Sequence, residues 1–264
     1  RMKRRFNITG ACSPQKHYMV RLDDRGERIK KEYVDEGCYF IINKGRQYGK
    51  TTTLKALVKC LERDYIVLFL DFQKISSRKF ADERSFSKAF ADKLLSAFRT
   101  VKTLDKEELQ EILLDFINDS SDIGLDELFG CLSRLCEGSL HPIVLMIDEI
   151  DSAGNNQIFL DFLAQMRAYY LERDDMPIFH SVILAGVYDI KNLKLKLRPD
   201  EEHMYNSPWN IAAEFNIDMN FSVTQIASML QEYEEDKHTK MDVRQTAECI
   251  YAYTSGYPYL VSAI

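Results

Sequence analysis

The residues with the clearest chemical potential lie in the stretch NKGRQYGKTTTL, residues 43–54. Its Gly-Lys-Thr triplet ends the phosphate-binding pattern of a glycine, four residues and Gly-Lys-Ser/Thr. The first glycine of that pattern would fall where the chain has Lys44, and Gly45 comes one residue late. In a working loop of this kind, Lys50 would reach the β- and γ-phosphates of ATP, and the hydroxyl of Thr51 would ligate Mg²⁺. Read alone, the triplet also fits a surface turn, so its setting has to decide.

A second stretch with chemical potential is PIVLMIDEID, residues 142–151, an apolar run that ends in Asp148 and Glu149. An acid at the tip of such a strand can hold Mg²⁺ together with Thr51, and the acid beside it can deprotonate the attacking water. These acids alone would also fit a solvated loop. Two elements in the expected order, each directly after an apolar run, favour a nucleotide site over two chance matches.

The elements that must position these residues alternate along the chain. Four short apolar runs predict strands at 38–43, 65–72, 142–148 and 180–187. Amphipathic patterns predict helices at 50–63, 85–99, 106–118, 125–137 and 158–173. Consecutive apolar residues are typical of strands buried on both faces of a parallel sheet, and the alternation predicts helices on both sides. We therefore predict an α/β fold, a P-loop NTPase core of three layers. Gly45 is expected to supply the bend that Lys44 cannot.

The pattern changes after about residue 190, where an irregular stretch contains at most one short strand at 209–213. Helical patterns follow at 224–237 and 242–255, and another helix starts at GYP. The expected organisation is an N-terminal segment packing near the nucleotide, an ATPase core and a C-terminal helical lid subdomain, at 1–36, 37–220 and 221–264. The abrupt apolar ending leads us to expect a longer protein.

Composition narrows the function classes. The chain has 264 residues, 45% hydrophobic and 29% charged, with a net charge of −6. No apolar run approaches the ~20 residues of a membrane helix, and the acidic balance gives no reason to expect direct nucleic-acid binding by this segment. The cysteines include no CxxC pair, which favours thiols in the core or on helix faces over a metal site. Unpaired thiols of this kind fit a reducing cytoplasm best. They stand at 12, 38, 60, 131, 136 and 249.

Together these stretches resemble a bacterial family of AAA-like ATPases. Its members carry a Cys-Xaa-Pro-Xaa-Xaa-His-Tyr-Met segment, here ACSPQKHYMV at 11–20, before a loop of the form Arg/Lys-Xaa-Arg-Gln-Xaa-Gly-Lys-Thr-Thr. The likeness extends over nearly the whole chain, through VLMIDEID, SVILAGVYDIKNLK, SPWNIAAEFNIDM and YTSGYPYLVS. The absence of the first glycine, at Lys44, would then be a feature that the family shares. Some relatives continue into a restriction-endonuclease-like nuclease, so a fused or partner effector domain is expected.

The wider likeness to AAA+ and STAND ATPase switches implies further nucleotide contacts. Tyr18, next to His17, falls where this group often covers the adenine, although a core role is the alternative. Pro258 in GYP resembles a proline that packs on adenine, and it equally fits a helix-initiating proline. Arg46 would add charge near the γ-phosphate or pair with an acid. The predicted cofactor-binding residues are Gly45, Arg46, Gln47, Tyr48, Gly49, Lys50, Thr51, Thr52, Tyr18 and Pro258.

Two more roles follow only from this resemblance. The polar γ-phosphate sensor would fall at Tyr188 or Asp189, neither of which is the usual residue type. An arginine finger would fall at Arg198. The alternative is that Arg198 lies in a solvated basic loop without a catalytic role.

These observations predict a Mg²⁺-dependent ATPase of low turnover that uses ATP to drive a conformational switch. Lys50, Asp148 and Glu149 are its expected catalytic residues, and Thr51 and Asp148 its metal ligands. The expected partners are ATP and ADP, another copy of the chain, and a nuclease-like effector. Two alternatives stay open: a P-loop kinase of a small molecule, and a non-hydrolysing ATP-binding adaptor.

Overall fold

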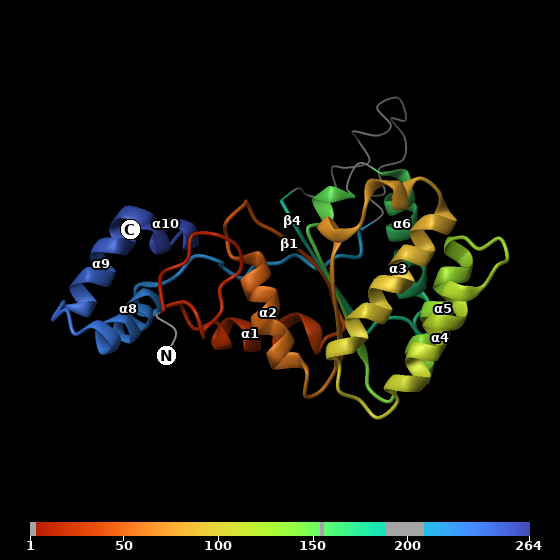
Figure 1. Cartoon of the computed structure of the whole chain (residues 1–264), viewed down its shortest axis with the longest axis horizontal. Helices are drawn as coiled ribbons and strands as arrows, with labels where there is room; N and C mark the ends of the chain where they lie inside the picture. The colour runs from red at the N-terminus through yellow and green to blue at the C-terminus, as the bar shows by residue number, and fades with distance from the viewer. Residues whose placement is uncertain (1–3, 154–155, 188–208) are drawn as a thin grey trace. The chain divides into compact units, whose positions relative to one another are not determined.

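The computed structural model describes residues 4–153, 156–187 and 209–264 (Figure 1). The chain divides into two compact units, each of which is described by itself. The first unit comprises Arg1–Ile29, Lys44–Cys60 and Asn216–Ile264, and the second comprises Lys30–Asn43 and Leu61–Phe215. None of the helices in the described ranges is long and apolar enough to cross a membrane.

The second unit contains a parallel sheet of four strands in the order β1-β4-β3-β2. Asn43 at the end of β1 pairs with Gly186, and Asp71 at the end of β2 pairs with Asp148. Because the strands are parallel, their carboxyl ends meet at one edge, so Asn43 and Asp148 lie at the same edge of the sheet. The predicted strands and parallel α/β fold are confirmed. Their bounds are β1 Tyr39–Asn43, β2 Ile66–Asp71, β3 Ile143–Asp148 and β4 Ser181–Gly186.

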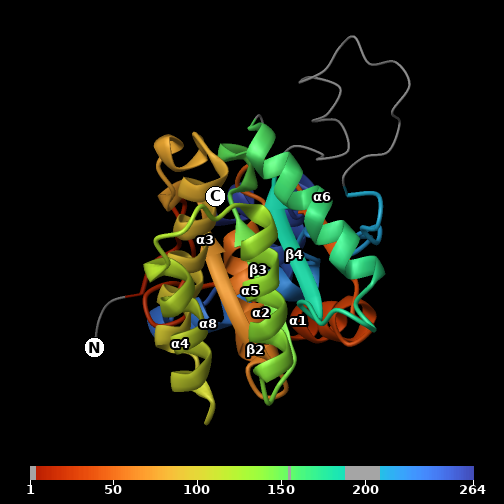
Figure 2. The same cartoon turned by 90° about the vertical axis from the view of Figure 1, so that its right-hand side faces the viewer.

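Helices cover one face of this sheet in the second unit (Figure 2). They are α3 Glu83–Ala97, α4 Lys106–Asn118, α5 Leu125–Gly138 and α6 Gln157–Leu171. Because side chains alternate between the faces of a strand, every second strand residue joins the core with these helices. The strand residues of this core are Tyr39, Ile41, Ile66, Leu68, Leu70, Ile143, Leu145, Ile147, Val182 and Leu184.

Local signals set where these helices begin. The carboxylate of Asp82 accepts a hydrogen bond from the N–H of Ser85 at 2.7 Å at the start of α3. The amide oxygen of Asn156 accepts from the N–H of Ile158 at 2.9 Å at the start of α6. Such caps satisfy N–H groups that have no partner within the helix. The predicted helix ranges are confirmed to within a few residues at their ends.

The first unit joins the N-terminal segment to helices from the end of the chain. Its helices are α1 Asp23–Ile29, α2 Lys50–Leu61, α8 Val223–Lys237, α9 Val243–Thr254 and α10 Pro258–Ala263. A buried cluster holds these distant pieces together: Tyr18, Val20, Leu22, Ile226, Met229, Leu230, Ala247, Ile250 and Val261. Helix α1 was not predicted, because its seven residues are largely charged and carry no clear apolar period.

Shorter turns complete the second unit, a π-helical turn at Lys30–Val34 and 3₁₀ turns at Phe72–Lys74, Ser77–Phe80, Phe98–Thr100 and Ile150–Ser152. At 209–213, where at most one short strand was expected, the structure has one bridge, in which the N–H of Ala213 donates to the carbonyl of Tyr39 at 2.8 Å. The fully buried Trp209 stacks on the ring of Tyr39, with centroids 5.8 Å apart. Packing of this ring therefore anchors the segment where strand pairing does not.

Candidate functional site

The candidate phosphate loop follows β1 directly in the chain and ends where α2 begins. The ammonium of Lys50 donates to the carbonyls of Lys44 and Gly45, at 2.7 and 2.9 Å. The loop therefore wraps around this side chain, which is only 9% exposed. Since the first N–H groups of a helix lack partners within it, the start of α2 offers donors to an anion.

Two positions of the loop have left-handed backbone, Gln47 with φ 65° and Gly49 with φ 74°. Neither Lys44 nor Gly45 has positive φ. Position 44 therefore needs no glycine, which explains why lysine is accommodated there. Gly45, which was expected to supply the flexibility of the bend, does not use the left-handed conformation open to glycine; Gln47 and Gly49 do. A side chain in this conformation costs about 1–3 kcal/mol, which surrounding contacts must offset.

The threonine after the metal-binding candidate has a structural partner in the first unit. The hydroxyl of Thr52 accepts a hydrogen bond from the backbone N–H of Cys12 at 3.2 Å. Cys12 belongs to the segment 11–20, which lies before the loop in the chain and carries part of the resemblance to the family. In the same segment the N–H of Ser13 donates to Nδ1 of His17 at 3.0 Å, and the N–H of His17 donates to the carbonyl of Ser13 at 2.8 Å. The structure therefore connects this N-terminal turn to the start of α2.

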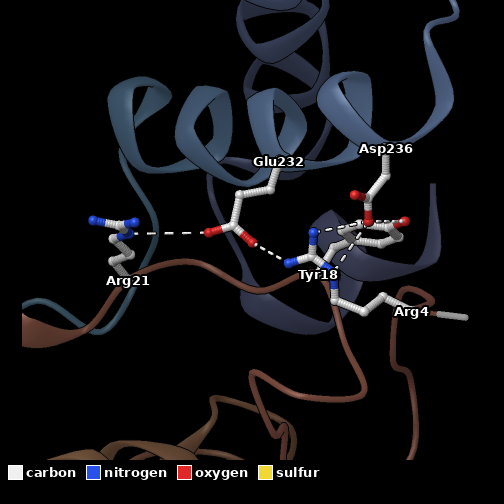
Figure 3. Close-up of polar contacts among 5 residues, drawn as sticks. All are labelled: Arg4, Tyr18, Arg21, Glu232 and Asp236. Carbon is white, nitrogen blue, oxygen red and sulfur yellow. Dashed lines mark hydrogen bonds and ion pairs between the residues drawn. The ribbon is translucent and has the colours of Figure 1, made fainter. Parts of the chain in front are cut away.

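Tyr18 lies in the core of the first unit. It is 2% exposed, and its ring packs against Phe6 and Tyr233 with centroids 5.3 Å from each. Its hydroxyl donates to Oδ2 of Asp236 at 3.0 Å (Figure 3). Burial, followed by this hydrogen bond, raises the pKa of Tyr18. This placement favours the core role over adenine contact.

The same view shows how the N-terminal segment is attached to α8. The guanidinium of Arg4 contacts Glu232 at 2.7 Å and Asp236 at 2.8 Å, and Arg21 lies 3.9 Å from Glu232 (Figure 3). The guanidinium of Arg4 also lies over the ring of Tyr18, 4.8 Å from its centroid. The two acids on α8 thus hold a segment that is more than 200 residues away in the chain.

Pro258 occupies the first turn of α10 and is buried. Gly256, just before it, has φ 75°, and a Cβ there would lie 2.0 Å from the carbonyl oxygen of Phe221. The N–H of Phe221 donates to the carbonyl of Gly256 at 2.8 Å. This geometry matches a helix-initiating proline after a glycine turn. Its adenine contact stays a prediction.

The candidate acids lie at the carboxyl end of β3 in the second unit. Asp148 is 2% exposed, and its Oδ1 accepts from the N–H of Glu149 at 3.0 Å. Glu149 has left-handed backbone, φ 57° and ψ 41°, and begins the 3₁₀ turn Ile150–Ser152. This reversal directly after the strand leaves Glu149 partly exposed while Asp148 stays buried. Strained backbone of this kind often accompanies functional sites.

Sequence reasoning left Asp151 without a role, although it closes the IDEID stretch. Its Oδ2 accepts a hydrogen bond from the N–H of Val187, directly after β4, at 2.7 Å. The carboxylate therefore ties the loop after β3 to the end of the neighbouring strand. Its closeness to the other two acids was the available signal.

Oxygen donors are the ligands that Mg²⁺ prefers, and it keeps several waters and substrate phosphates when bound to proteins. The hydroxyl of Thr51 and the carboxylate of Asp148 fit that chemistry. The described ranges contain no group of three His, Cys, Asp or Glu residues that could hold an ion. Thr51 belongs to the first unit and Asp148 to the second.

The sensor candidates Tyr188 and Asp189 and the finger candidate Arg198 lie outside the described residues.

A parallel sheet whose first strand runs into a candidate phosphate loop, and whose third strand ends at paired acids, is the arrangement of a P-loop nucleotide-binding protein. The chain belongs to the AAA-like domain family, whose pattern matches residues 9–264. The resemblance to AAA-like ATPases that was seen in the sequence is therefore confirmed for the family. No curated protein matches the chain significantly.

Solved structures share the fold at low sequence identity. The Walker-type ATPase PABY2304 of Pyrococcus abyssi matches with TM-score 0.54 and 17% identity over 97% of this chain. Cdc6p from Pyrobaculum aerophilum gives 0.53 and 10%, and the Aeropyrum pernix ORC2 protein gives 0.50 and 13%, each again over 97% of this chain. The chain spans 69% of the first of these structures and 62% of the other two.

Proposed function

We propose that the chain binds Mg·ATP and hydrolyses it slowly to drive a conformational switch. The observation that carries this proposal is the loop wrapped around Lys50, between β1 and the start of α2. Its carbonyls lie 2.7 and 2.9 Å from the ammonium. Support comes also from the similar ORC2 protein, which was solved as ADPNP and ADP complexes.

In this proposal Lys50 exchanges its loop carbonyls for the β- and γ-phosphates, as the lysine of a phosphate loop does. Thr51 and Asp148 are the proposed ligands of Mg²⁺, which when bound neutralises charge that develops on the phosphates. Glu149 accepts a proton from the attacking water. Its partly exposed position after the buried Asp148 suits the two acids to these separate roles.

The binding step is tested with Lys50→Ala and isothermal titration of ATP and ADP. Loss of a hydrogen bond from a charged group corresponds to about 10- to 150-fold in affinity. Lys55→Ala is the matched control, because Lys55 is an exposed lysine on the same helix. Equal affinities of the parent and Lys50→Ala for both nucleotides would remove the basis of the proposal.

The hydrolytic step is tested with Glu149→Gln. Removal of a general base typically lowers turnover by about 10²–10⁴-fold, while binding of ATP should be retained. Phosphate release is measured with no acceptor present, which separates a hydrolase from a kinase. If Glu149→Gln releases phosphate as fast as the parent, the base lies elsewhere.

The expected low turnover rests on the absence of a partner-supplied arginine in a lone subunit, which is worth about 10³–10⁵-fold in related enzymes. We propose that a second copy or an effector domain, nuclease-like in some relatives, completes the switch. Light scattering with ADP and with ATP in Glu149→Gln should then show an ATP-dependent change in mass. An unchanged monomer with both nucleotides would exclude a homo-oligomeric switch.

A further inference from the structure

The turn between α9 and α10 carries a tyrosine that touches the phosphate loop. The hydroxyl of Tyr257 donates a hydrogen bond to the carbonyl oxygen of Arg46, at 2.8 Å. Its ring lies beside that of Tyr48, with centroids 4.7 Å apart and planes inclined by 55°. The ring of Tyr48 in turn lies 3.5 Å from the position of a Cβ on Gly45. All four residues belong to the first unit.

The bonded carbonyl belongs to the peptide group that joins Arg46 to Gln47. In a planar trans peptide the C=O and the following N–H point in opposite directions. A hydrogen bond that fixes the carbonyl of Arg46 therefore also fixes the direction of the N–H of Gln47. Backbone N–H groups are the donors with which a phosphate loop holds its anion.

The same peptide precedes the strained residue of the loop. Gln47 has φ 65°, which an L side chain adopts at a cost of about 1–3 kcal/mol. A neutral hydrogen bond contributes about 0.5–1.5 kcal/mol, a comparable amount. The bond from Tyr257 thus offsets part of the strain in the loop.

Tyr257 is itself held firmly. Its N–H donates to the carbonyl of Thr254 at 2.9 Å, and its carbonyl accepts from the N–H of Val261 at 3.0 Å. The preceding Gly256 is bonded to Phe221, as described above. A side chain on an anchored turn can hold a loop that is 211 residues away in the chain.

We infer that Tyr257 is a positioning residue of the phosphate loop, which directs the N–H of Gln47 toward the β-phosphate of a bound nucleotide. The inference rests on the proposed function and deepens it. In the GYP stretch, the residue that acts on nucleotide binding is then Tyr257, which acts by positioning the phosphate loop. The sequence had suggested Pro258, which would contact the adenine. ATP and ADP share the β-phosphate, so both depend on Tyr257, whereas AMP does not.

The test compares Tyr257→Phe with the parent. This variant keeps the ring against Tyr48 and removes only the hydroxyl. We expect the affinities for ATP and ADP to fall equally, by about 3- to 10-fold, the value of one neutral hydrogen bond. AMP affinity should not change. Tyr253→Phe is the control, since Tyr253 is 80% exposed on α9.

A second measurement needs no nucleotide. Amide exchange in residues 46–49 of the free protein should be faster in Tyr257→Phe than in the parent, with equal melting temperatures showing an intact fold. If the parent binds ADP and Tyr257→Phe binds it equally well, the inference is overturned while the proposed function stands. If the parent binds no nucleotide, the proposed function fails, and unchanged exchange in the variant then overturns the inference as well.

Discussion

The carboxylate of Asp151 accepts a hydrogen bond from the backbone N–H of Val187 at 2.7 Å. This contact joins the loop after β3, which begins at Glu149, to the residue that follows β4. The approach is close, because a Cβ on Gly186 would lie 2.7 Å from Cγ1 of Ile150 and 3.0 Å from Oδ1 of Asp151. The position of Glu149 therefore depends on packing against the neighbouring strand.

Replacement of Asp151 should destabilise the protein. Asp151→Ala leaves the N–H of Val187 without this acceptor, and a hydrogen bond to a charged group is worth about 1.5–3 kcal/mol. Asp151→Asn should lose less, because its amide oxygen can still accept. Urea unfolding measures the free energy, with Asp92→Ala, an exposed acid on α3, as the control. Equal stability of Asp151→Ala and the parent would contradict this account.

The attachment of the N-terminal segment to α8 should depend on salt. Arg4→Ala removes the contacts to Glu232 and Asp236, whose side chains are about one third exposed, so we expect a loss of only about 0.5–1 kcal/mol. The loss should shrink at 1 M salt because of screening. Arg244→Ala, which breaks the far more exposed pair with Glu248, is the control and should change stability less. Urea unfolding at both salt concentrations measures this, and a larger effect of Arg244→Ala would refute it.

The adjacent threonines Thr52 and Thr53 of α2 should respond differently to replacement by valine. Thr52→Val removes the acceptor of the Cys12 N–H and should cost about 0.5–1.5 kcal/mol. The hydroxyl of Thr53 is buried without a hydrogen-bond partner within the described structure, so Thr53→Val should be neutral or stabilising. Thermal and urea unfolding of the two variants provide a matched pair. A larger loss for Thr53→Val than for Thr52→Val would show that the two environments are misassigned.

Stability should fall in alkali through Tyr65. Burial, followed by the hydrogen bond to Asp35 at 2.7 Å, raises the pKa of Tyr65 to about 12, against about 10 in an unfolded chain. A raised pKa favours the protonated form in the folded state, so this contribution is complete below pH 10 and lost between pH 10 and 12. The stability difference between the parent and Tyr65→Phe should shrink over that window. A difference that stays constant to pH 12, or ultraviolet titration of Tyr65 near pH 10, would count against it.

The local elements and the main candidate residues could be predicted from the order of amino acids. Apolar runs gave the strands and amphipathic periods most of the helices, because side-chain periodicity is written in neighbouring residues. The same local order places Lys50 and Thr51 at the start of a helix, and Asp148 and Glu149 at the end of a strand. At 209–213, where at most one short strand was expected, the structure has one bridge. The left-handed backbone of the loop lies at Gln47 and Gly49 and not at Gly45.

Which groups meet across long distances in the chain could be seen only in the folded structure. The hydrogen bond from Tyr257 to Arg46 joins residues 211 positions apart, and Tyr18 reaches Asp236 across 218. No local pattern distinguishes a tyrosine that bonds a loop carbonyl from one that faces solvent, such as Tyr253. Such contacts depend on where the chain returns after folding, because a hydrogen bond requires two groups within about 3 Å and in alignment.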